Sequence, residues 1–246
     1  MEHALPGRRI LVTGASSGVG AATAAVCVRS GARVALLARR VSHVQGLAAE
    51  LGDAAIATPA DVRDEAAVAR AVSLAAEHLG GLDGVVHAAG LNRAALLADG
   101  TAAHWREMLE TNLLGAFIVT QATLPHLVAA GGADVLAVSS MSGRRVLSPA
   151  MGVYAATKAG LSRWAEALWL EVADRDIRVM LLSPGFIDTE FAEQTVDPDL
   201  RADNRARLAQ TGLDPAEVAA EITHMLARPR HVRLGDVTIM PTAQRH

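Results

Sequence analysis

A tyrosine and a lysine, Tyr154 and Lys158, stand four residues apart in this sequence. That spacing places both side chains on one face of a helix. A phenol with its ordinary pKa of about 10 is a poor acid at neutral pH, and a nearby ammonium lowers that pKa. Tyr154 can then give its proton to a carbonyl oxygen as hydride reaches the carbon, while Lys158 can also hold a nicotinamide ribose. The pair predicts hydride chemistry on a carbonyl or an alcohol.

The composition strengthens this interpretation of the pair. Of the 23 basic residues only Lys158 is a lysine, and Tyr154 is the only tyrosine. Abundant alanine and arginine with scarce lysine are typical of a GC-rich coding sequence, in which arginine replaces lysine wherever charge alone is enough. The alternative is an ordinary Tyr/Lys pair on a helix surface. Because both residues are unique in the chain, we favour the catalytic interpretation.

A glycine-rich turn, Thr13–Gly20, follows the first apolar run and precedes a helical stretch. Glycines let the backbone turn tightly and approach a pyrophosphate, and the N-terminus of the next helix offers free N–H groups to the phosphates. The residues expected to contact a dinucleotide here are Gly14, Ser16, Ser17, Gly18, Val19 and Gly20. The alternative is a tight turn that binds no ligand.

Two arginines, Arg39 and Arg40, stand at the end of the second apolar run, where an enzyme that uses NAD carries an acid. No carboxylate is present there to repel a 2′-phosphate, and two guanidiniums can bind one. The sequence therefore predicts NADP(H) as the cofactor, unless the arginines are simply a solvated surface pair. Asp61, followed by Val62, could accept the adenine amino group; the alternative is a helix-capping aspartate.

Two further polar residues are candidates for the reacting end. Ser140 is expected at the carboxyl end of the fifth strand, where ligands of such sheets bind, and could orient the substrate oxygen. Ser139 and Ser142 are rivals for that role, and serines are common in turns. Asn112 could hold a water near Lys158 and relay protons, or could be an ordinary amide on a helix face.

The elements that must position these residues alternate between strand and helix. We expect strands at Ile10–Thr13, Arg33–Ala38, Ala54–Pro59, Gly84–His87, Ala133–Ser139, Arg178–Ser183 and Asp236–Met240, and helices near Gly18–Ser30, Glu65–Leu79, Thr101–Ala129, Val153–Asp174 and Pro215–Ala227. This alternation predicts an α/β fold with a doubly wound parallel sheet, covered by helices on both faces, in one domain over residues 1–246. The polar residues 186–212 are expected to form an inserted loop over the substrate.

Composition narrows the class of protein further. With a net charge of −3, the chain has no broad basic surface for nucleic acid or anionic lipid. No continuous apolar run approaches the roughly 20 residues of a membrane helix, and the N-terminus carries no apolar export signal. Cys27 is the only cysteine, so we expect no disulfide within the chain and no metal site. We expect a cytoplasmic enzyme acting on a small molecule.

Taken together, the motifs resemble those of the short-chain dehydrogenase/reductase family in its single-domain form. They are Thr13–Gly20, Asp61, Ala88–Gly90, Asn112, Ser140, Tyr154, Lys158 and Pro184–Gly185. The resemblance implies a Rossmann fold with a seven-stranded sheet and a catalytic tetrad of Asn112, Ser140, Tyr154 and Lys158. It also implies cofactor contacts from Ala89, Gly90, Pro184, Gly185, Ile187 and Thr189, and assembly into a homodimer or homotetramer through the Thr101–Ala129 and Val153–Asp174 helices. Trp164 and Trp169 suit such an interface or a buried core.

Two segments depart from the family pattern. Where members usually carry Asn-Asn-Ala-Gly, this chain has His87, Ala88, Ala89 and Gly90, so amide hydrogen bonds to the sheet should be lost. We interpret His87 as a strand-end residue rather than a catalyst. The tail at 235–242 lacks the Val-Asp-Gly-Gly ending of acyl-carrier-type ketoreductases and resembles the bacterial subgroup near clavulanate dehydrogenase and the 3-hydroxy-acid dehydrogenases.

The substrate pocket is expected to be lined by 91–97, 141–151 and 186–212. Its apolar residues, Leu91, Leu96, Leu97, Val146, Leu147 and Met151, suit an apolar or aromatic ketone, with Ser140, Met141, Met151 and Phe186 touching it. Arg144 and Arg145 could bind a substrate anion or be solvated. Analogy suggests a role in antibiotic biosynthesis. The alternatives are a dehydrogenase working toward oxidation and a sensor or scaffold that binds NADP(H) without turnover.

Overall fold

Seven parallel strands form one sheet in a computed structural model that describes residues 4–196 and 198–244. They are β1 (Arg9–Thr13), β2 (Arg33–Leu37), β3 (Ala55–Ala57), β4 (Gly84–His87), β5 (Ala133–Val138), β6 (Ile177–Pro184) and β7 (Asp236–Ile239). Their order is β3-β2-β1-β4-β5-β6-β7. The predicted Rossmann fold and all seven predicted strands are confirmed, with small differences at their ends.

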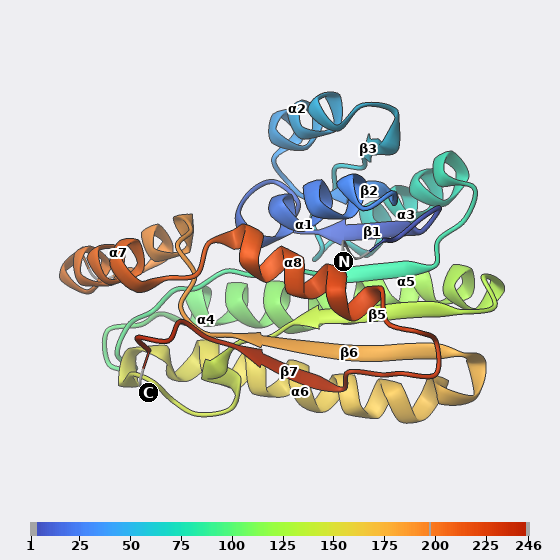
Figure 1. The fold of residues 1–246 in the computed structure, drawn as a ribbon. Helices are drawn as coiled ribbons and strands as arrows, with labels where there is room; N and C mark the ends of the chain where they lie inside the picture. Colours follow the sequence, from blue (N-terminus) through green and yellow to red (C-terminus); the bar gives the residue numbers. More distant parts are fainter. Residues whose placement is uncertain (1–3, 197, 245–246) are drawn as a thin grey trace.

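Helices cover both faces of the sheet (Figure 1). They are α1 (Gly18–Arg29), α2 (Val41–Leu51), α3 (Glu65–Leu79), α4 (Ala102–Leu109), α5 (Gly115–Ala129), α6 (Gly152–Val172), α7 (Pro198–Thr211) and α8 (Pro215–Leu226). Side chains of α3, α5 and α6 pack on one face and those of α1, α2 and α8 on the other. This double cover explains why the central strands are apolar along their whole length instead of alternating.

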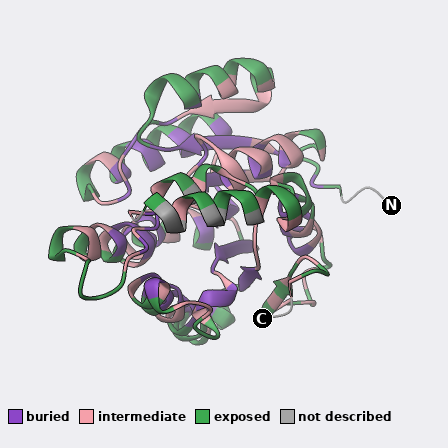
Figure 2. Cartoon of the chain, turned by 90° about the vertical axis from the view of Figure 1, so that its left-hand side faces the viewer, coloured by how far each residue is buried: buried purple, intermediate pink, exposed green. Residues whose placement is uncertain are grey.

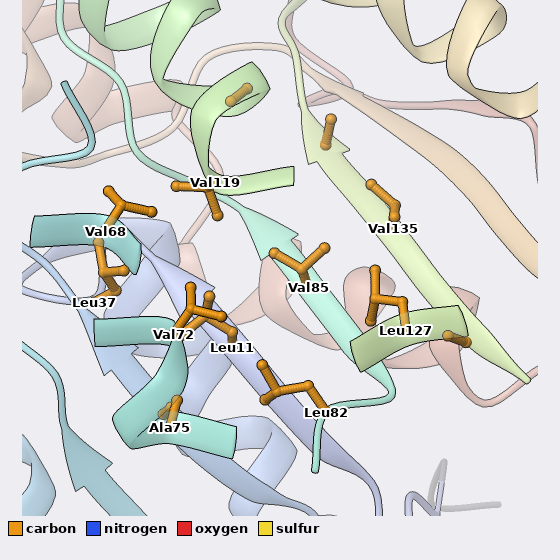
Figure 3. Packing of buried hydrophobic residues seen from close by; sticks show 14 of the residues in the cluster. Leu11, Leu37, Val68, Val72, Ala75, Leu82, Val85, Val119, Leu127 and Val135 are labelled. Atoms are coloured by element: carbon orange, nitrogen blue, oxygen red, sulfur yellow. The ribbon is translucent and has the colours of Figure 1, made fainter. Parts of the chain in front are cut away.

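The packing on one face is shown in Figure 3. Leu11 and Val85 project from neighbouring strands and meet Val72 of α3, and all three are at most 1% exposed. Burying a side chain of this size contributes about 1.5–3 kcal/mol. The last helix begins as the sequence predicts, because Asp214 and Glu217 form a reciprocal capping box around Pro215.

Two helices were not predicted. One residue of the helix α2, Val44, is fully buried, and no side chain caps the helix at Arg40, so the sequence offers no capping signal for its start. The second is α7, which follows a 3₁₀ segment at Glu190–Gln194. The expectation of an irregular loop over 186–212 is therefore wrong, because a polar helix with no apolar stripe escapes a search for hydrophobic periodicity.

The predicted Thr101–Ala129 helix contains a change of winding. Its helices α4 and α5 are joined by a π-helical turn at Glu110–Leu114. In the described part of the chain, Ala102–Ala129 is also long and apolar enough to cross a membrane by length and composition, with a mean hydropathy of 1.3. This stretch is not one continuous apolar run, because Arg106, Glu107 and Glu110 interrupt its first half. In the fold this stretch is part of the helical layer, where Val119 and Leu127 are buried against the sheet.

The place where the strand order reverses lies between β1 and β4. Ligands of doubly wound sheets bind at this switch point, beyond the carboxyl ends of the strands. Figure 2 looks onto that edge, with buried strands at the centre and exposed helix faces around them. In Figure 1, α7 projects past the arrowheads of β6 and β7 on the same side. The fold thus gathers the segments that follow the strands around one opening.

Candidate active site

A cavity of about 750 Å³ opens at this edge of the sheet. Every residue expected to contact the cofactor lines it, namely Gly14, Ser16, Ser17, Gly18, Val19, Gly20, Arg39, Arg40, Asp61, Val62, Ala89, Gly90, Tyr154, Lys158, Pro184, Gly185, Ile187 and Thr189. Ser140, Met141, Met151 and Phe186, expected to contact the substrate, line it as well. Residues from both halves of the chain therefore meet around one cavity.

The glycine turn at one end of the cavity has no space for side chains. Gly14 has φ +69°, and a Cβ there would lie 2.7 Å from the Ala88 carbonyl oxygen. A Cβ on Gly20 would overlap the carbonyl oxygen of Gly14. At the start of α1, Ser17 makes no side-chain capping bond and the first turn has no acid. The exposed backbone N–H groups and the helix dipole fit a pyrophosphate at this position.

The loop after β4 keeps its attachment to the sheet despite its unusual sequence. The Thr13 hydroxyl accepts hydrogen bonds from the backbone N–H groups of Ala88 and Ala89, each at 3.1 Å. A Cβ on Gly90 would lie 3.5 Å from both the Asn112 Oδ1 and the Lys158 Nζ. This backbone therefore passes directly beside two of the expected catalytic residues.

The adenosine end of the cavity carries the two arginines. Arg40 donates to the hydroxyls of Ser16 and Ser17, and its guanidinium lies 3.5 Å from the Glu190 carboxylate. The guanidinium of Arg39 lies 3.9 Å from the carboxylate of Asp61, and its side chain is 53% exposed. Both guanidiniums are accessible on the cavity wall. An anionic ligand can displace their present carboxylate partners, because ion pairs exposed to solvent are weak.

Asp61 is more strongly held than the sequence indicates. Arg63 donates to both of its carboxylate oxygens, with the shortest contact at 2.6 Å. Burial raises the pKa of Asp61, but the hydrogen bonds and the charge of Arg63 outweigh it and keep that pKa below its ordinary value. The helix-capping alternative is wrong, because Asp64 caps α3 by accepting from the Ala67 N–H.

The reacting end is built from α6 and the segment after β5. Tyr154 and Lys158 are 7% and 5% exposed, and the Lys158 Nζ lies 5.9 Å from the centre of the tyrosine ring. The ammonium donates to the Val138 carbonyl oxygen at 2.9 Å. Ser140 lines the same cavity as Tyr154, and its hydroxyl is close enough to lower the pKa of the phenol, so the structure brings these two residues together. The rival Ser139 instead bonds the backbone oxygen of Lys158, and Ser142 donates its N–H to Ser140.

Burial dominates the ionisation of the tyrosine and lysine. It raises the pKa of Tyr154 to about 12 against the opposing hydrogen bond from Ser140, and it lowers the pKa of Lys158 to about 8. The net shift of the Tyr154 pKa is upward, not downward as expected from the ammonium alone, because desolvation of the phenolate outweighs the stabilising effects. At neutral pH the phenol carries its proton, which is the state a proton donor needs.

Asn112 lies in the π-helical turn and is 1% exposed. Its side chain accepts from the Leu91 N–H at 2.8 Å and donates to the Leu91 carbonyl oxygen at 2.9 Å and to the Thr157 hydroxyl. It does not line the main cavity. The structure therefore places this amide behind the wall, where it fixes the backbone beside Gly90 and the α6 turn between Tyr154 and Lys158.

His87, which stands where the family usually has an asparagine, ends β4 and is 4% exposed. Its Nε2 lies 2.9 Å from the Thr120 hydroxyl, and its ring meets Trp164 edge-on at 5.8 Å. Burial lowers the pKa of this imidazole to about 4. The side chain is part of the core between β4 and the helices α5 and α6, as expected of a strand-end residue.

We expect the free energy of unfolding to fall as the pH drops from about 6.5 to about 4. Below its ordinary pKa of 6.5 the unfolded His87 binds a proton, whereas the folded residue stays neutral down to about 4. The difference costs the folded state about 3 kcal/mol. When urea unfolding is measured at several pH values, the free energy of unfolding of His87→Asn should fall less between pH 6.5 and about 4 than that of the parent protein. The exposed His78→Asn is the matched control, and an equal flattening in both variants would contradict the assignment.

Some residues that were expected in the substrate wall lie outside the cavity. Leu96, Leu97 and Val146 are 49%, 69% and 64% exposed and do not line the cavity. Arg144 pairs with Asp236 and, like Arg145, lies outside the cavity. In a loop that follows a strand, the first side chains can face the cavity and later ones face solvent. Composition alone does not show at which residue this change occurs.

The remaining wall comes mostly from the three ranges expected to line it, which contribute Asn92, Arg93, Ser148, Glu190, Phe191, Glu193, Gln194, Thr195 and Leu208. Thr111 also lines the cavity and lies outside those ranges. The Phe191 ring packs edge-on against Tyr154, with 5.4 Å between ring centres. Most of these residues come from 186–212, where the sequence pattern does not show which side chains face the cavity.

Comparison with known proteins agrees with this geometry. The model of the short chain dehydrogenase family matches residues 8–199. Glycine betaine reductase of Emericella nidulans is 34% identical over 96% of this chain, and the chain spans 19% of that longer protein. An alcohol dehydrogenase from Thermococcus sibiricus, solved with 5-hydroxy-NADP, has a TM-score of 0.86 and 29% identity over 97% of this chain and 98% of its own.

A short chain dehydrogenase from Burkholderia cenocepacia, solved with NADP, has a TM-score of 0.84. It is 32% identical and covers 96% of this chain and 97% of its own. The likeness includes both the sheet and the segments that carry the cavity, since it extends over nearly the whole length of both chains. The chain therefore belongs to the short-chain dehydrogenase family of oxidoreductases.

Proposed function

We propose that the protein reduces a ketone or aldehyde with NADPH and that Tyr154 is the proton donor. One observation carries the proposal. A buried phenol close to the Lys158 ammonium lines the same cavity as Ser140 and a glycine turn that fits a pyrophosphate. The protonated state of Tyr154 at neutral pH is the state that reduction of a carbonyl group requires of its proton donor.

The residues present fit NADP(H) better than NAD(H). Arg39 and Arg40 offer two guanidiniums at the adenosine end, and the carboxylate of Asp61 is already held by Arg63. The Thermococcus and Burkholderia structures contain NADP or a derivative of it, which supports the same cofactor here. The glycine turn and the free N-terminus of α1 suit the pyrophosphate.

When bound, NADPH supplies the hydride that reaches the carbonyl carbon. The residues of this chain do the rest. Ser140 holds the carbonyl oxygen beside the Tyr154 hydroxyl, and Tyr154 donates its proton to that oxygen as negative charge develops there. Lys158 stabilises the resulting phenolate, and Asn112 keeps the backbone beside it fixed. Phe191 excludes water from one side of the phenol.

The substrate side of the cavity supports an apolar or aromatic ketone. Leu91, Met141, Leu147, Met151 and Phe191 line it, and such a wall binds hydrocarbon through burial. We propose that residues 186–212 cover this side as a substrate-binding segment within the single domain. A role in the reduction of an antibiotic intermediate rests on analogy and on the GC-rich composition.

We further propose that the protein forms a homodimer or homotetramer through α4, α5 and α6. Support comes from large apolar side chains exposed on these helices, Leu109, Leu114, Val128 and Leu170, of which Leu170 is 74% exposed. A surface of this kind on a folded chain is typical of a contact between subunits. Sedimentation of the parent protein and of Leu170→Glu tests this directly.

The reaction is tested by following NADPH oxidation at neutral pH with aliphatic ketones, aromatic ketones and aldehydes. We expect turnover that depends on the ketone and is faster with NADPH than with NADH. Tight cofactor binding without turnover of any carbonyl compound would contradict the proposal and favour a sensor or scaffold role.

Replacing Arg40 with glutamine should weaken NADPH binding about 10- to 100-fold and leave NADH binding nearly unchanged. A hydrogen bond between a cation and a phosphate contributes about 1.5–3 kcal/mol, and NADH has no phosphate at that position. Fluorescence titration with both cofactors measures the effect. Arg70→Gln, on the exposed face of α3 and outside the cavity, removes the same charge and serves as control. Equal losses for the two cofactors would show that Arg40 does not bind the 2′-phosphate.

A further inference from the structure

We infer that the substrate is an uncharged hydroxyketone, whose hydroxyl group is bound by Asn92 and Thr195 in the wall of the cavity. This inference rests on the proposed function and adds a second point of recognition to it. The carbonyl group meets Ser140 and Tyr154, and the apolar part of the molecule lies along the leucine, methionine and phenylalanine side chains. Asn92 and Thr195 then select the hydroxyl.

The first observation is a pair of polar atoms without partners. Asn92 is 3% exposed and Thr195 is 1% exposed, and both residues line the main cavity. Among the described residues, neither the Asn92 Oδ1 nor the Thr195 Oγ1 has a hydrogen-bond partner. Buried polar atoms in folded proteins are nearly always paired, and these two belong to the wall of one cavity, which also contains the Thr111 Oγ1, likewise unpaired in the described part of the chain. We take the pair beside the phenol to indicate a ligand that satisfies it.

The second observation is that the two residues belong to the reacting end. The Asn92 Nδ2 donates to the sulfur of Met151, which packs in the same cluster as Tyr154. The backbone N–H of Asn92 donates to the Gln194 side chain, and Gln194 directly precedes Thr195. The 3₁₀ segment that ends at Gln194 also carries Phe191 against the Tyr154 ring. Asn92 and Thr195 thus lie among residues that surround the phenol, away from the glycine turn.

The third observation concerns the charges on this side of the cavity. Arg93 is bound by Glu107, with 3.0 Å between its Nε and a carboxylate oxygen. Glu193 pairs with Arg205 at 3.1 Å. Arg93, which follows Asn92, and Glu193, two residues before Thr195, therefore each have an ionic partner. Lys158 at the reacting end donates to a backbone oxygen, and Glu190 lies beside Arg40 at the cofactor end. A substrate carboxylate or ammonium would have to break one of these pairs, so an uncharged substrate fits better.

A hydroxyl group is the uncharged group that suits both orphaned atoms. The Asn92 Oδ1 can only accept a hydrogen bond, whereas the Thr195 hydroxyl can both donate and accept. A ligand hydroxyl placed between the two side chains would donate to the Asn92 Oδ1 and accept from the Thr195 hydroxyl. A methyl group at the same place would leave both atoms buried and unpaired, and sites built for a hydroxyl discriminate strongly against analogues that lack it.

The test uses aryl ketones that carry a terminal hydroxyl on alkyl chains of increasing length, each matched with an analogue in which methyl replaces the hydroxyl. For the parent enzyme we expect kcat/KM to be at least about tenfold higher for the best hydroxyketone than for its analogue. Thr195→Val keeps the shape but removes the hydroxyl, and should reduce this ratio about tenfold through KM while activity on the methyl analogue stays. Thr195→Ser should retain the preference.

Thr23→Val is the matched control, because the Thr23 hydroxyl is also buried and unpaired but lies in α1 outside the cavity. It should leave the ratio unchanged. A parent enzyme that prefers the methyl analogues, or a Thr195→Val ratio equal to that of Thr23→Val, would overturn the hydroxyl site and leave ketone reduction standing. Absence of turnover across the whole panel would overturn the proposed function, and the hydroxyl site with it.

Discussion

Tyr154→Phe should lower kcat for ketone reduction by about 10²–10⁴-fold while leaving the dissociation constant of NADPH nearly unchanged. The substitution removes the proton donor and the hydrogen bond with Ser140 but keeps the ring that packs against Phe191. Single-turnover measurements with saturating NADPH and ketone separate the chemical step from binding.

Ser140→Ala provides the comparison, because it removes the partner hydroxyl and keeps the donor. Its rate should fall less than that of the phenylalanine variant, since the Tyr154 hydroxyl still carries its proton at neutral pH. A Tyr154→Phe enzyme that reduces ketones within a few-fold of the parent rate would rule out the phenol as the donor.

Replacing Lys158 with arginine should lower kcat/KM about 10²-fold even though the charge is retained. The Nζ sits 3.5 Å from where a Gly90 Cβ would stand and donates to Val138 at 2.9 Å. A Cβ on Gly143 would come within 2.8 Å of the Lys158 backbone, so the helix cannot shift away. A planar guanidinium is larger and needs more acceptors than this buried site offers, and a displacement of about 1 Å costs about 10²-fold in rate.

The reverse exchange elsewhere on α6 is the control. Arg163 is 73% exposed and pairs with Glu166, so Arg163→Lys should have no measurable effect on rate or stability. This contrast also tests the interpretation of the composition, in which arginine replaced lysine wherever charge alone was enough. An active Lys158→Arg enzyme would show that the single lysine persists in this chain by chance.

The fold and the cofactor end were predictable because their signals are local in the sequence. Strands buried on both faces appear as continuous apolar runs. The glycine-rich turn Thr13–Gly20 can be recognised because it stands between a predicted strand and a predicted helix. Tyr154 and Lys158 were found by their spacing and their uniqueness. Each of these features depends on residues that are close together in the sequence, so their relative positions can be inferred without knowing the tertiary fold.

What escaped prediction depends on contacts between distant segments. Asn92 and Thr195 are far apart in the chain, and both line the cavity because residues 186–212 fold back beside the loop that follows β4, where the Asn92 N–H donates to Gln194. The pairing of Asp61 with Arg63, and the outward turn of Leu97 and Val146, are likewise decided by packing. The pKa of Tyr154 is a further case, because desolvation is a property of the folded surroundings and no motif encodes it.

The most direct test of hydride transfer uses NADPH that carries deuterium at the reacting carbon of the nicotinamide, with each of the two epimers supplied separately. The alcohol product is analysed by mass spectrometry and NMR. We predict that one epimer gives an alcohol with a single deuterium on the carbon that bore the carbonyl oxygen, and that Tyr154→Phe forms almost none of it. NADPH consumption without deuterium at that carbon from either epimer would contradict the account.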